Sequence, residues 1–565
     1  MDTAPTGDTG RPVIPRNDYS VLDPPQIGRW SPELGVSVIV PAYGNQQTLD
    51  LCLAALASQS YPPELTEVIV VDDGSAPGLR LSETAPKGTR IIANPGPVFG
   101  IASAVNTGAR AASNDVILRL DSDIIVNRHH VETHMRWHHL VDYATVIGKV
   151  SIVADPLPTL TPASVHEAVE DNRAWDLFDG LGVDPRWSAK LIDKYDELKD
   201  LEDRAFLVAN GASVSFSRFL YESAGGLDPA MKLGEDTEFA YRLAQSGSVF
   251  IPDKGAECWH LGVPQMRSRE EEGRRYREPG FANRIPVMRQ LREQPGVAWS
   301  VPYADVVVDT AGAPFEAVRD TVFSVLGGTL ADTRVTLVGS WSALDEDTRT
   351  PLDDPRQDLR LIRQAFEGDS RVRYVEQAPP TSAPAPFRLT LPAGVVLTHD
   401  ALREFTAVAD RERTGRINFA MSGRDEPTTA VFDRTAALAR ALHVGSDGGD
   451  LNTVIGELWG VHWQDGDDWI AREFEELETA PRFVSLLKEN ERLSRDCAKQ
   501  RSRADDWKDR AAAARKSAAQ WEQAAGRWER SAAEWERKAQ SSANRPRPTF
   551  LRRLHAKISR RDIRN

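Results

Sequence analysis

Val116-Ile-Leu-Arg-Leu-Asp121-Ser122-Asp123 is the stretch from which the fold and the chemistry of this chain are best inferred. An apolar run of strand character ends directly in two carboxylates that are one residue apart. Such a pair can hold a hard divalent cation and leave open positions for phosphate oxygens. The alternative is a turn that carries two solvated aspartates. The first interpretation predicts chemistry on a nucleoside diphosphate.

Two further acidic motifs flank this stretch at a distance. Val68-Ile-Val-Val-Asp72-Asp73-Gly74-Ser75 precedes it and also places acids directly after an apolar run. Gly234-Glu235-Asp236 follows it, and a carboxylate from this motif could serve as a general base. For Asp73-Gly74 the alternative is a simple turn. For Glu235 and Asp236 it is a helix N-terminus whose acids complement the helix dipole, which is compatible with catalysis.

Apolar runs with strand character alternate with segments of helical spacing in the first half of the chain. This alternation predicts an α/β fold with a mostly parallel sheet and ligands at the carboxyl ends of its strands. Pro41 is expected to end the first strand. We expect this domain to span 35–300, after a polar leader at 1–34. The expected strands are 36–40, 68–71, 90–93 and 116–120, and the expected helices are 48–59 and 101–112.

A second α/β unit at 301–478 resembles a repeat of the first. Ala304–Val308 parallels Val36–Val40, Arg334–Val338 parallels Glu67–Val71, and Phe387–Leu391 parallels Val116–Leu120. The acidic positions are blank in this unit, because Gly339, Ser340, Pro392 and Gly394 stand where Asp72, Asp73, Asp121 and Asp123 would be. We interpret the unit as a degenerate duplicate; a chance likeness of two α/β units is the alternative.

Composition narrows the function classes. A formal net charge of -14 argues against nucleic acid as a partner of the whole chain. The 3 cysteines are far apart and form neither a disulfide framework nor a zinc site, which is typical of a reducing compartment. The N-terminal residues do not resemble a signal peptide, and no run of 18 apolar residues occurs. These features favour a cytoplasmic protein.

The C-terminal region has a seven-residue repeat. In 483–540 a large residue, often tryptophan, alternates with a small one along a single seam, which predicts a coiled coil that forms a homo-oligomer. A stripe of tryptophans that stacks on a ligand is the alternative. The basic tail at 546–565 could lie on an anionic membrane at the inner face, or it could simply be solvated.

Four motifs in order resemble the family 2 glycosyltransferases of the GT-A fold. They are Ser37-Val-Ile-Val-Pro-Ala-Tyr43, Val70-Val-Asp-Asp-Gly-Ser75, Asp121-Ser-Asp123 and Gly234-Glu-Asp-Thr-Glu-Phe239. The resemblance covers roughly 36–265. It implies transfer of a hexosyl or N-acetylhexosaminyl group from a nucleotide-sugar, usually UDP-linked, with inversion at the anomeric carbon. It also implies a requirement for Mn²⁺ or Mg²⁺, and a glycan or polyol-type acceptor.

The resemblance assigns roles to individual residues. Tyr43 is expected to stack on the base, Asp72 or Asp73 to accept a hydrogen bond from uracil, and Asp121 to lie near the ribose. Asp123 is the expected metal ligand and His260 a second one, although a lone histidine is often structural. Asp236 is the expected base and Glu235 the residue that binds acceptor hydroxyls. Together the expected nucleotide-sugar contacts are Pro41, Tyr43, Asp72, Asp73, Asp121 and Ser122.

Some positions depart from the family pattern or have two interpretations. Val105 stands where many members carry an arginine near the diphosphate, and Ala212-Ser213 replaces a Gly-Asn pair. Trp259 could stack on a sugar. The histidines at 129–139 are expected to lie on a packed or solvated helix rather than at a metal. The arginines at 267–277 belong either to a loop that closes on the donor or to a salt-bridged surface helix.

The sequence therefore predicts a cytoplasmic, metal-dependent inverting glycosyltransferase that builds or decorates a cell-surface glycan. The main alternative is a non-catalytic scaffold that binds a glycan or a nucleotide-sugar and is held together by the coiled coil. A nucleotidyltransferase would normally carry a Gly-rich basic loop after the first strand, which Ala42-Tyr43-Gly44-Asn45 does not provide.

Overall fold

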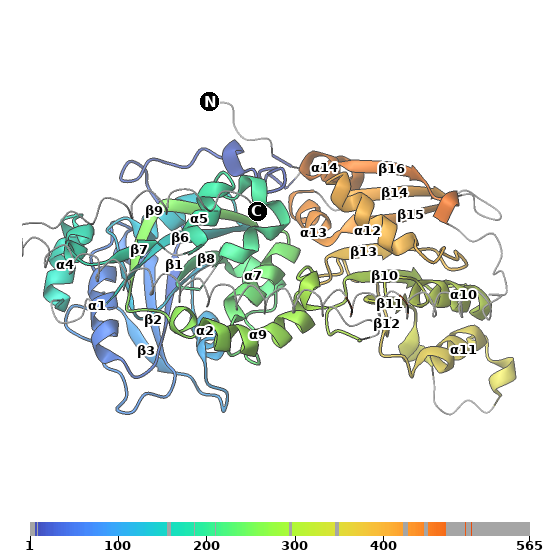
Figure 1. Ribbon diagram of the computed structural model, residues 1–565, viewed down its shortest axis with the longest axis horizontal. Helices are drawn as coiled ribbons and strands as arrows, with labels where there is room; N and C mark the ends of the chain where they lie inside the picture. Colours follow the sequence, from blue (N-terminus) through green and yellow to red (C-terminus); the bar gives the residue numbers. More distant parts are fainter. Residues whose placement is uncertain are drawn as a thin grey trace, which may run out of the picture. The chain divides into compact units, whose positions relative to one another are not determined.

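The computed structural model describes residues 6–469, apart from 8, 155–159, 186, 210, 293–296, 345–349, 422–427 and 446–449, and also residues 492 and 499. Met1–Glu473 forms one compact unit with two mixed β-sheets and surrounding helices (Figure 1). The α/β class predicted from the sequence is thus confirmed. The predicted coiled coil at 483–540 and the basic tail at 546–565 lie outside the described residues, apart from 492 and 499.

The first sheet contains the acidic motifs. Its strand order is β3-β2-β1-β4-β8-β6-β9-β5, with β7 paired to β6. The four strands β3, β2, β1 and β4 are parallel, and β8 and β5 run against their neighbours. The bounds are β1 Val36–Ala42, β2 Thr66–Asp72, β3 Arg90–Ala93, β4 Val116–Leu120, β5 Ile124–Val126, β6 Ala144–Val153, β7 Val183–Pro185, β8 Ser213–Ser217 and β9 Val249–Leu261.

Helices cover both faces of this sheet because its strands are apolar on both sides. In β1, Val38 and Val40 face one core, whereas Ile39 faces the other. β1 continues through Pro41, so the proline does not end the strand as expected. The helices of this part are α1 Gln46–Leu56, α2 Ile101–Ala111, α3 His130–His138, α4 Pro162–Glu170, α5 Trp187–Lys194, α6 Arg218–Ser223, α7 Glu235–Gln245, α8 Gln265–Ser268 and α9 Glu270–Arg284.

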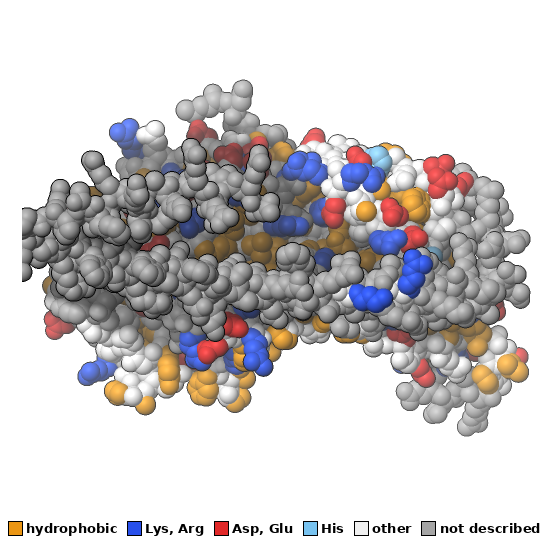
Figure 2. Space-filling view, in the orientation of Figure 1, with side chains coloured by type: hydrophobic (Ala, Val, Ile, Leu, Met, Phe, Trp, Pro, Cys, Tyr) orange, Lys and Arg blue, Asp and Glu red, His pale blue; other side chains and the backbone are white. Residues whose placement is uncertain are grey.

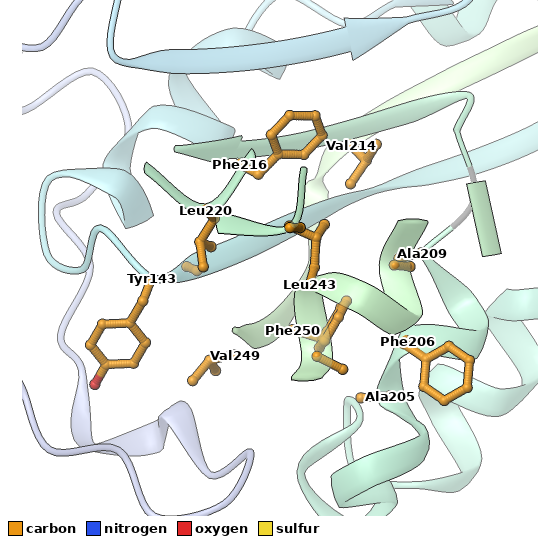
Figure 3. Close-up of a cluster of buried hydrophobic side chains, with 14 of the residues drawn as sticks. Tyr143, Ala205, Phe206, Ala209, Val214, Phe216, Leu220, Leu243, Val249 and Phe250 are labelled. Carbon is orange, nitrogen blue, oxygen red and sulfur yellow. The ribbon is translucent and has the colours of Figure 1, made fainter. Parts of the chain in front are cut away.

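One of the two cores packs α7 against the sheet. Figure 3 shows Leu243 of α7 among Phe216 of β8, Phe250 of β9 and Phe206. Phe206 belongs to a 3₁₀ segment, η5 (Lys199–Val208), that leads toward β8. These aromatic side chains are almost fully buried, so they fix α7, and with it the acids at its first turn, against the sheet.

The second sheet repeats the order and the strand directions of the first. Its order β12-β11-β10-β13-β15-β14-β16 matches β3-β2-β1-β4-β8-β6-β9, with the same parallel and antiparallel pairs. The register agrees as well, since Ala304 pairs with Phe387 as Val36 pairs with Val116. The bounds are β10 Ala304–Asp309, β11 Thr333–Val338, β12 Val372–Val375, β13 Phe387–Thr390, β14 Arg416–Met421, β15 Thr428–Arg434 and β16 Val461–Asp465; the helices are α10 Phe315–Leu326, α11 Gln357–Phe366, α12 Ala401–Arg411, α13 Thr435–Val444 and α14 Leu451–Leu458.

The leader is polar in composition but is packed into the protein. Val13, Ile14 and Tyr19 are buried in the same core as residues of the first sheet. The amide of Asn17 donates to the carbonyls of Leu198 and Phe250 and accepts from the N–H of Phe250. The leader therefore adds buried apolar side chains to this core although it forms no long helix or strand among the described residues.

Arg440 of α13 ties the leader to both sheet regions. Its buried guanidinium donates to the carbonyls of Gly247, Ser248, Ile14 and Arg16. It also lies 4.4 Å from the ring of Trp459. The apolar core here is continuous, because Leu438 and Val444 of α13 belong to the cluster that contains Ile14. The two sheet regions therefore form a single cooperative structure rather than loosely linked domains.

Three histidines of α3 form a buried ladder against β8. His130 contacts Ser213 at 2.8 Å, His134 contacts Ser215 at 2.8 Å and Ser213 at 3.2 Å, and His138 contacts Ser215 at 2.8 Å. All three imidazoles are buried, which confirms the packed-helix interpretation. Burial lowers the pKa of His130 to about 4 and that of His138 to about 3, and it also lowers that of His134. The ladder is thus neutral at pH 7.

This ladder predicts that stability falls between pH 6.5 and pH 5. The unfolded chain protonates its histidines below pH 6.5 while the folded ladder stays neutral, so the stability present above pH 6.5 is lost as the pH falls toward the folded pKa values. The loss is roughly 1.4 kcal/mol per histidine per pH unit. Urea unfolding at pH 7.5, 6.5 and 5.5 measures it. His138→Gln should flatten the dependence and His166→Gln, at a partly buried position outside the ladder, should not. A constant free energy of unfolding would contradict the prediction.

Candidate active site at the carboxyl edge of the first sheet

The acids at the ends of β2 and β4 lie at one edge of the first sheet. In the parallel pairing Ala42 of β1 is opposite Asp72 of β2, and Ile39 of β1 is opposite Arg119 of β4. The carboxyl ends of these strands therefore meet at the same edge, where ligands bind in open α/β sheets. The edge carries Tyr43 after β1, Asp73 after β2 and Asp121 after β4.

Asp72 and Asp73 organise the loops on the β2 side. Asp72 accepts from the N–H groups of Ser75 at 2.8 Å and Leu79 at 3.1 Å. Partial burial acts to raise the pKa of Asp72, but these hydrogen bonds outweigh it and hold the pKa below its ordinary value. Asp73 accepts from the amide of Asn94 at 2.6 Å and the N–H of Gly100 at 2.7 Å. Both carboxylates shape a turn, and each has lone pairs left for a ligand.

Exposed aromatic side chains lie beside this turn. Tyr43 is 71% exposed, and the N–H of the following Gly44 donates to the Ser75 hydroxyl at 2.8 Å. Phe99 is 55% exposed and packs on the backbone of Gly74, where an added Cβ would come within 3.0 Å of its ring. Pro41, by contrast, is buried within β1. The sequence analysis missed Phe99, although its place in the Pro- and Gly-rich loop 94–100 could have indicated it.

Asp121, Ser122 and Asp123 form the turn between β4 and β5, and all three are partly exposed. The N–H of Asp121 donates to the carbonyl of Ala212 at 3.2 Å, and the carbonyl of Asp121 accepts from the N–H of Ile124 at 3.2 Å. Backbone contacts thus hold the turn and leave the carboxylates to other partners. The turn and the ligand interpretations of this motif are therefore compatible.

His260, near the end of β9, lies beside Asp123. β5 pairs with β9 so that Ile124 is opposite His260, and Nε2 of His260 is 3.4 Å from Oδ2 of Asp123. Nδ1 of His260 is 3.0 Å from the carbonyl of Gly262. Because a carbonyl can only accept, Nδ1 carries a proton, and Nε2 is the ring nitrogen that faces Asp123.

This pair fits a divalent cation as two protein ligands. A neutral imidazole nitrogen and a carboxylate oxygen that face each other gain from a cation between them, and both are ordinary ligands of Mn²⁺. Within the ranges that the structure describes, no three His, Cys, Asp or Glu side chains form a set that could hold a metal. Oxygen atoms of a bound substrate or of water can complete the coordination of a cation held by such a pair.

Glu235 and Asp236 begin α7, and the local backbone presents them to the edge. Gly234 precedes the helix with φ of 81°, a conformation that glycine adopts without strain. A Cβ there would lie 2.5 Å from the ring of Phe281 in α9. Asp236 accepts from the N–H of Gly211 at 3.1 Å and the N–H of Thr237 at 2.7 Å. The carboxylate is held by two backbone donors, as a positioned base requires.

Glu235 is buried beside Asp236 at the start of α7. Burial raises the pKa of Glu235 to about 7, with a further contribution from the charge of Asp236 and an opposing one from Arg119. A carboxyl group that is partly protonated near neutral pH can donate a hydrogen bond to a hydroxyl oxygen. The two neighbours are therefore suited to different tasks, Glu235 to binding and Asp236 to proton abstraction.

Other candidates from the sequence analysis lie away from the edge or are packed. Val105 is buried in α2, so no charged side chain takes the place of the family arginine there. Trp259 is 3% exposed and packs on Phe178, so it is not available to stack on a sugar as expected.

The arginines at 267–277 lie on α8 and α9, which bears out the helical alternative rather than a loop. Arg267 pairs with Asp184, Arg269 with Glu272, and Arg274 with Glu278 at 3.2 Å. Figure 2 shows basic and acidic side chains intermingled on the described surface of the face that it draws. These arginines are thus part of an ion-paired surface.

Residues 37–201 match the family model "Glycosyl transferase family 2". The chain is 24% identical to the chondroitin synthase of Escherichia coli over 370 residues, which cover 61% of this chain and 50% of that protein. It is 29% identical to the hyaluronan synthase of Pasteurella multocida over 272 residues, 46% of this chain and 27% of that protein. The chain thus spans half or less of the length of these two relatives.

Among solved structures, a mannosyltransferase from Pyrobaculum calidifontis in complex with GDP-Man and Mn²⁺ is similar to this chain. The sequence identity is 20%, the TM-score is 0.29, and the match covers 47% of this chain and 69% of that one.

Proposed function

Because the chain contains a glycosyltransferase family 2 domain, at 37–201, we propose that it moves a sugar from a nucleotide-sugar to a glycan with inversion at the anomeric carbon. The observation that carries the proposal is the carboxyl edge of the first sheet. There Asp123 lies beside His260, and Arg119 lies between Asp121 and Glu235. The first sheet region therefore carries acids after β2 and β4, where Gly339, Ser340, Pro392 and Gly394 stand in the second.

The donor nucleoside is expected to bind on the β2 side of the edge. The exposed rings of Tyr43 and Phe99 offer apolar faces for a base. The carboxylate of Asp72 or Asp73 would accept a hydrogen bond from the N3–H of uracil, which favours a UDP-sugar. Asp121 and Ser122 would then contact the ribose and the diphosphate.

Asp123 and His260 would hold the metal. Their facing oxygen and nitrogen atoms, 3.4 Å apart, provide two ligands. When bound, Mn²⁺ or Mg²⁺ neutralises the charge that develops on the departing diphosphate. The hydrogen bond from His260 Nδ1 to Gly262 keeps the ring in the tautomer that this role needs.

The acceptor would bind at the N-terminus of α7. As the acceptor oxygen bonds to the anomeric carbon, the bond from that carbon to the diphosphate oxygen breaks. The hydroxyl proton passes to the carboxylate of Asp236, and a single displacement of this kind inverts the anomeric centre. Glu235 would hold a neighbouring hydroxyl of the acceptor.

The relatives named above support a glycan acceptor and a hexosyl or N-acetylhexosaminyl donor. A screen of UDP- and GDP-sugars for donor hydrolysis, with and without Mn²⁺, tests the proposal. Mn²⁺-dependent turnover of one donor is the expected result. Saturable binding of a nucleotide-sugar without any hydrolysis or transfer would instead favour a non-catalytic scaffold that binds a nucleotide-sugar or a glycan.

The second sheet region, 301–478, is best explained as a degenerate copy of the first. The shared strand order and register support duplication, and Pro392 and Gly394 follow β13 where Asp121 and Asp123 follow β4. This copy would stiffen the catalytic region through their continuous core and could bind acceptor glycan.

Deleting 483–565 is expected to lower the oligomeric state and to release the protein from anionic vesicles, while transfer to a small acceptor persists. In a coiled coil, the alternating large and small seam at 483–540 would bury apolar area only between helices. If the protein is cytoplasmic, the basic tail would bind the inner face of the membrane. Each Lys or Arg would contribute about 1 kcal/mol of binding free energy. Light scattering and vesicle sedimentation at rising salt measure the two effects.

Deleting only 546–565 is the matched control, since it should leave the oligomer and abolish vesicle binding. A monomeric full-length protein would refute the coiled coil, and vesicle binding that is insensitive to salt would refute the electrostatic anchor. Among the described residues, no helix has both the length and the apolar character needed to cross a membrane.

A further inference from the structure

Arg119 is a buried cation among the acids of the candidate site. It lies in β4, two residues before Asp121, and is only 3% exposed. Its Nη2 atom is 3.4 Å from Oδ1 of Asp121 and 3.5 Å from Oε1 of Glu235. One guanidinium thus reaches an acid of the turn between β4 and β5 and an acid of α7.

The same guanidinium lies against the backbone that holds Asp236. A Cβ added to Gly211 would be 2.0 Å from Cζ of Arg119, so only a glycine leaves room for the guanidinium there. The N–H of Gly211 donates to Oδ2 of Asp236. Arg119 therefore contacts two acids directly and a third through Gly211.

Charge balance explains why a cation is needed at this position. Carboxylates that converge at a partly buried edge repel one another, and desolvation also disfavours their charged forms. The charged groups that act on Glu235 are Asp236 on its own helix and Arg119 and Asp121 from the β4 side. Among these three, Arg119 alone favours the ionised form of Glu235.

The second sheet provides an internal comparison. Arg119 is opposite Ile39 in the first sheet, and Thr390 is opposite Val307 at the same register in the second. The second sheet lacks this arginine as well as the acids that follow β4. The arginine and the carboxylates are both present in the first sheet and both absent at these positions of the second. This is expected if the arginine balances the charge of the acids and is not needed for folding of the sheet.

We propose that Arg119 is a positioning residue that couples the donor-binding turn to the acceptor-binding helix, holding Glu235 and Asp236 in place for transfer. This inference rests on the proposed glycosyltransferase function. Because Arg119 is only 3% exposed and pairs with Asp121 and Glu235, it would act through these carboxylates rather than by contact with the sugar. Its loss should therefore affect use of the acceptor more than binding of the donor.

Arg119→Gln tests the coupling by removing the charge while keeping a polar side chain. We expect kcat for transfer to fall about 100-fold and KM for the acceptor to rise about tenfold, with donor affinity within threefold of the parent. Arg119→Lys keeps the charge and should recover at least part of kcat. Gly211→Ala, which would push the guanidinium away, should resemble Arg119→Gln.

Arg242→Gln is the matched control. Arg242 pairs at 2.7 Å with Glu238 of the same helix α7, but it is away from the acids of the edge. This variant should lower thermal stability and leave transfer per folded molecule unchanged. If Arg119→Gln keeps kcat within threefold, or if donor and acceptor use fall equally and Arg119→Lys recovers nothing, the coupling role is refuted.

A second measurement does not depend on turnover. Infrared titration of the protonated carboxyl signal of Glu235, assigned with Glu235→Gln, should show ionisation at a higher pH in Arg119→Gln than in the parent. An unchanged titration would overturn the proposal even if the chain proves to transfer no sugar. A shifted titration with no transfer by the parent would contradict the proposed function and leave the electrostatic role of Arg119 standing.

Discussion

Asp123→Ala is expected to lower metal-dependent turnover about 10³-fold, which corresponds to about 4 kcal/mol of transition-state stabilisation. Asp123 provides one of the two facing ligand atoms, and a cation held only by His260 would no longer be fixed beside the diphosphate. The fold should survive, because the backbone carbonyl of Asp123, not its side chain, accepts from the N–H of Leu261. Turnover at saturating donor over a range of Mn²⁺ concentrations measures the loss.

A control acid at the end of a strand in the second sheet makes this test specific. Asp465 ends β16, the strand that corresponds to β9, and its side chain accepts only a local N–H, that of Asp467, among the contacts described. Asp465→Ala should keep the parental rate and the parental response to Mn²⁺. Undiminished turnover in Asp123→Ala would refute the metal assignment, whereas a parallel loss of melting temperature and rate would indicate misfolding instead.

The acids at the strand ends could be predicted because their signal is local. An apolar run followed at once by aspartate marks a buried strand and its exposed end, as for Asp72 and Asp121. Parallel strands bring such ends to one edge. The same local pattern, without the acids, identified the second sheet. In both sheets the first strand pairs with the second in the same register, since Ser37 is opposite Glu67 and Asp305 is opposite Arg334.

Arg119 and the histidine ladder could not be predicted because their partners are distant in the sequence. Arg119 interrupts an apolar run, where a lone arginine gives no sign of the buried acid that it meets on α7. For α3, the four-residue spacing of His130 and His134 predicts a shared face. Only the packing of that face on Ser213 and Ser215, which alternate along β8, shows which hydroxyl groups the rings of His130 and His134 contact.

The leader shows a limit of composition as a guide. Its prolines and polar residues predicted a polar leader, yet Ile14 and Tyr19 are buried. A few apolar side chains are enough to anchor a segment when a neighbouring core has room for them. The average composition of the segment hides these few residues. Burial of a single side chain of this size contributes about 2 kcal/mol, so truncation of the leader would destabilise the whole unit.

Asp236→Asn is expected to abolish transfer, with a loss of at least about 10³-fold in kcat, while the donor still binds. Proton abstraction acts in the transition state and not on ground-state binding, so kcat falls and the donor dissociation constant stays close to that of the parent. The Asn oxygen can still accept from one backbone N–H, of Gly211 or Thr237, so the side chain keeps part of its support.

Two measurements separate a base from a binding residue at this position. Single-turnover transfer reports the chemical step, and calorimetry with the nucleotide-sugar and Mn²⁺ reports donor affinity. Glu238→Gln is the matched control, because Glu238 lies in the same first turn but is paired with Arg242 at 2.7 Å. It should transfer sugar at the parental rate per folded molecule. If donor affinity collapses in Asp236→Asn while kcat survives, Asp236 binds the donor and the base is another residue. Glu235 is then the nearest candidate. Because its pKa is raised to about 7, transfer would rise with pH through neutrality.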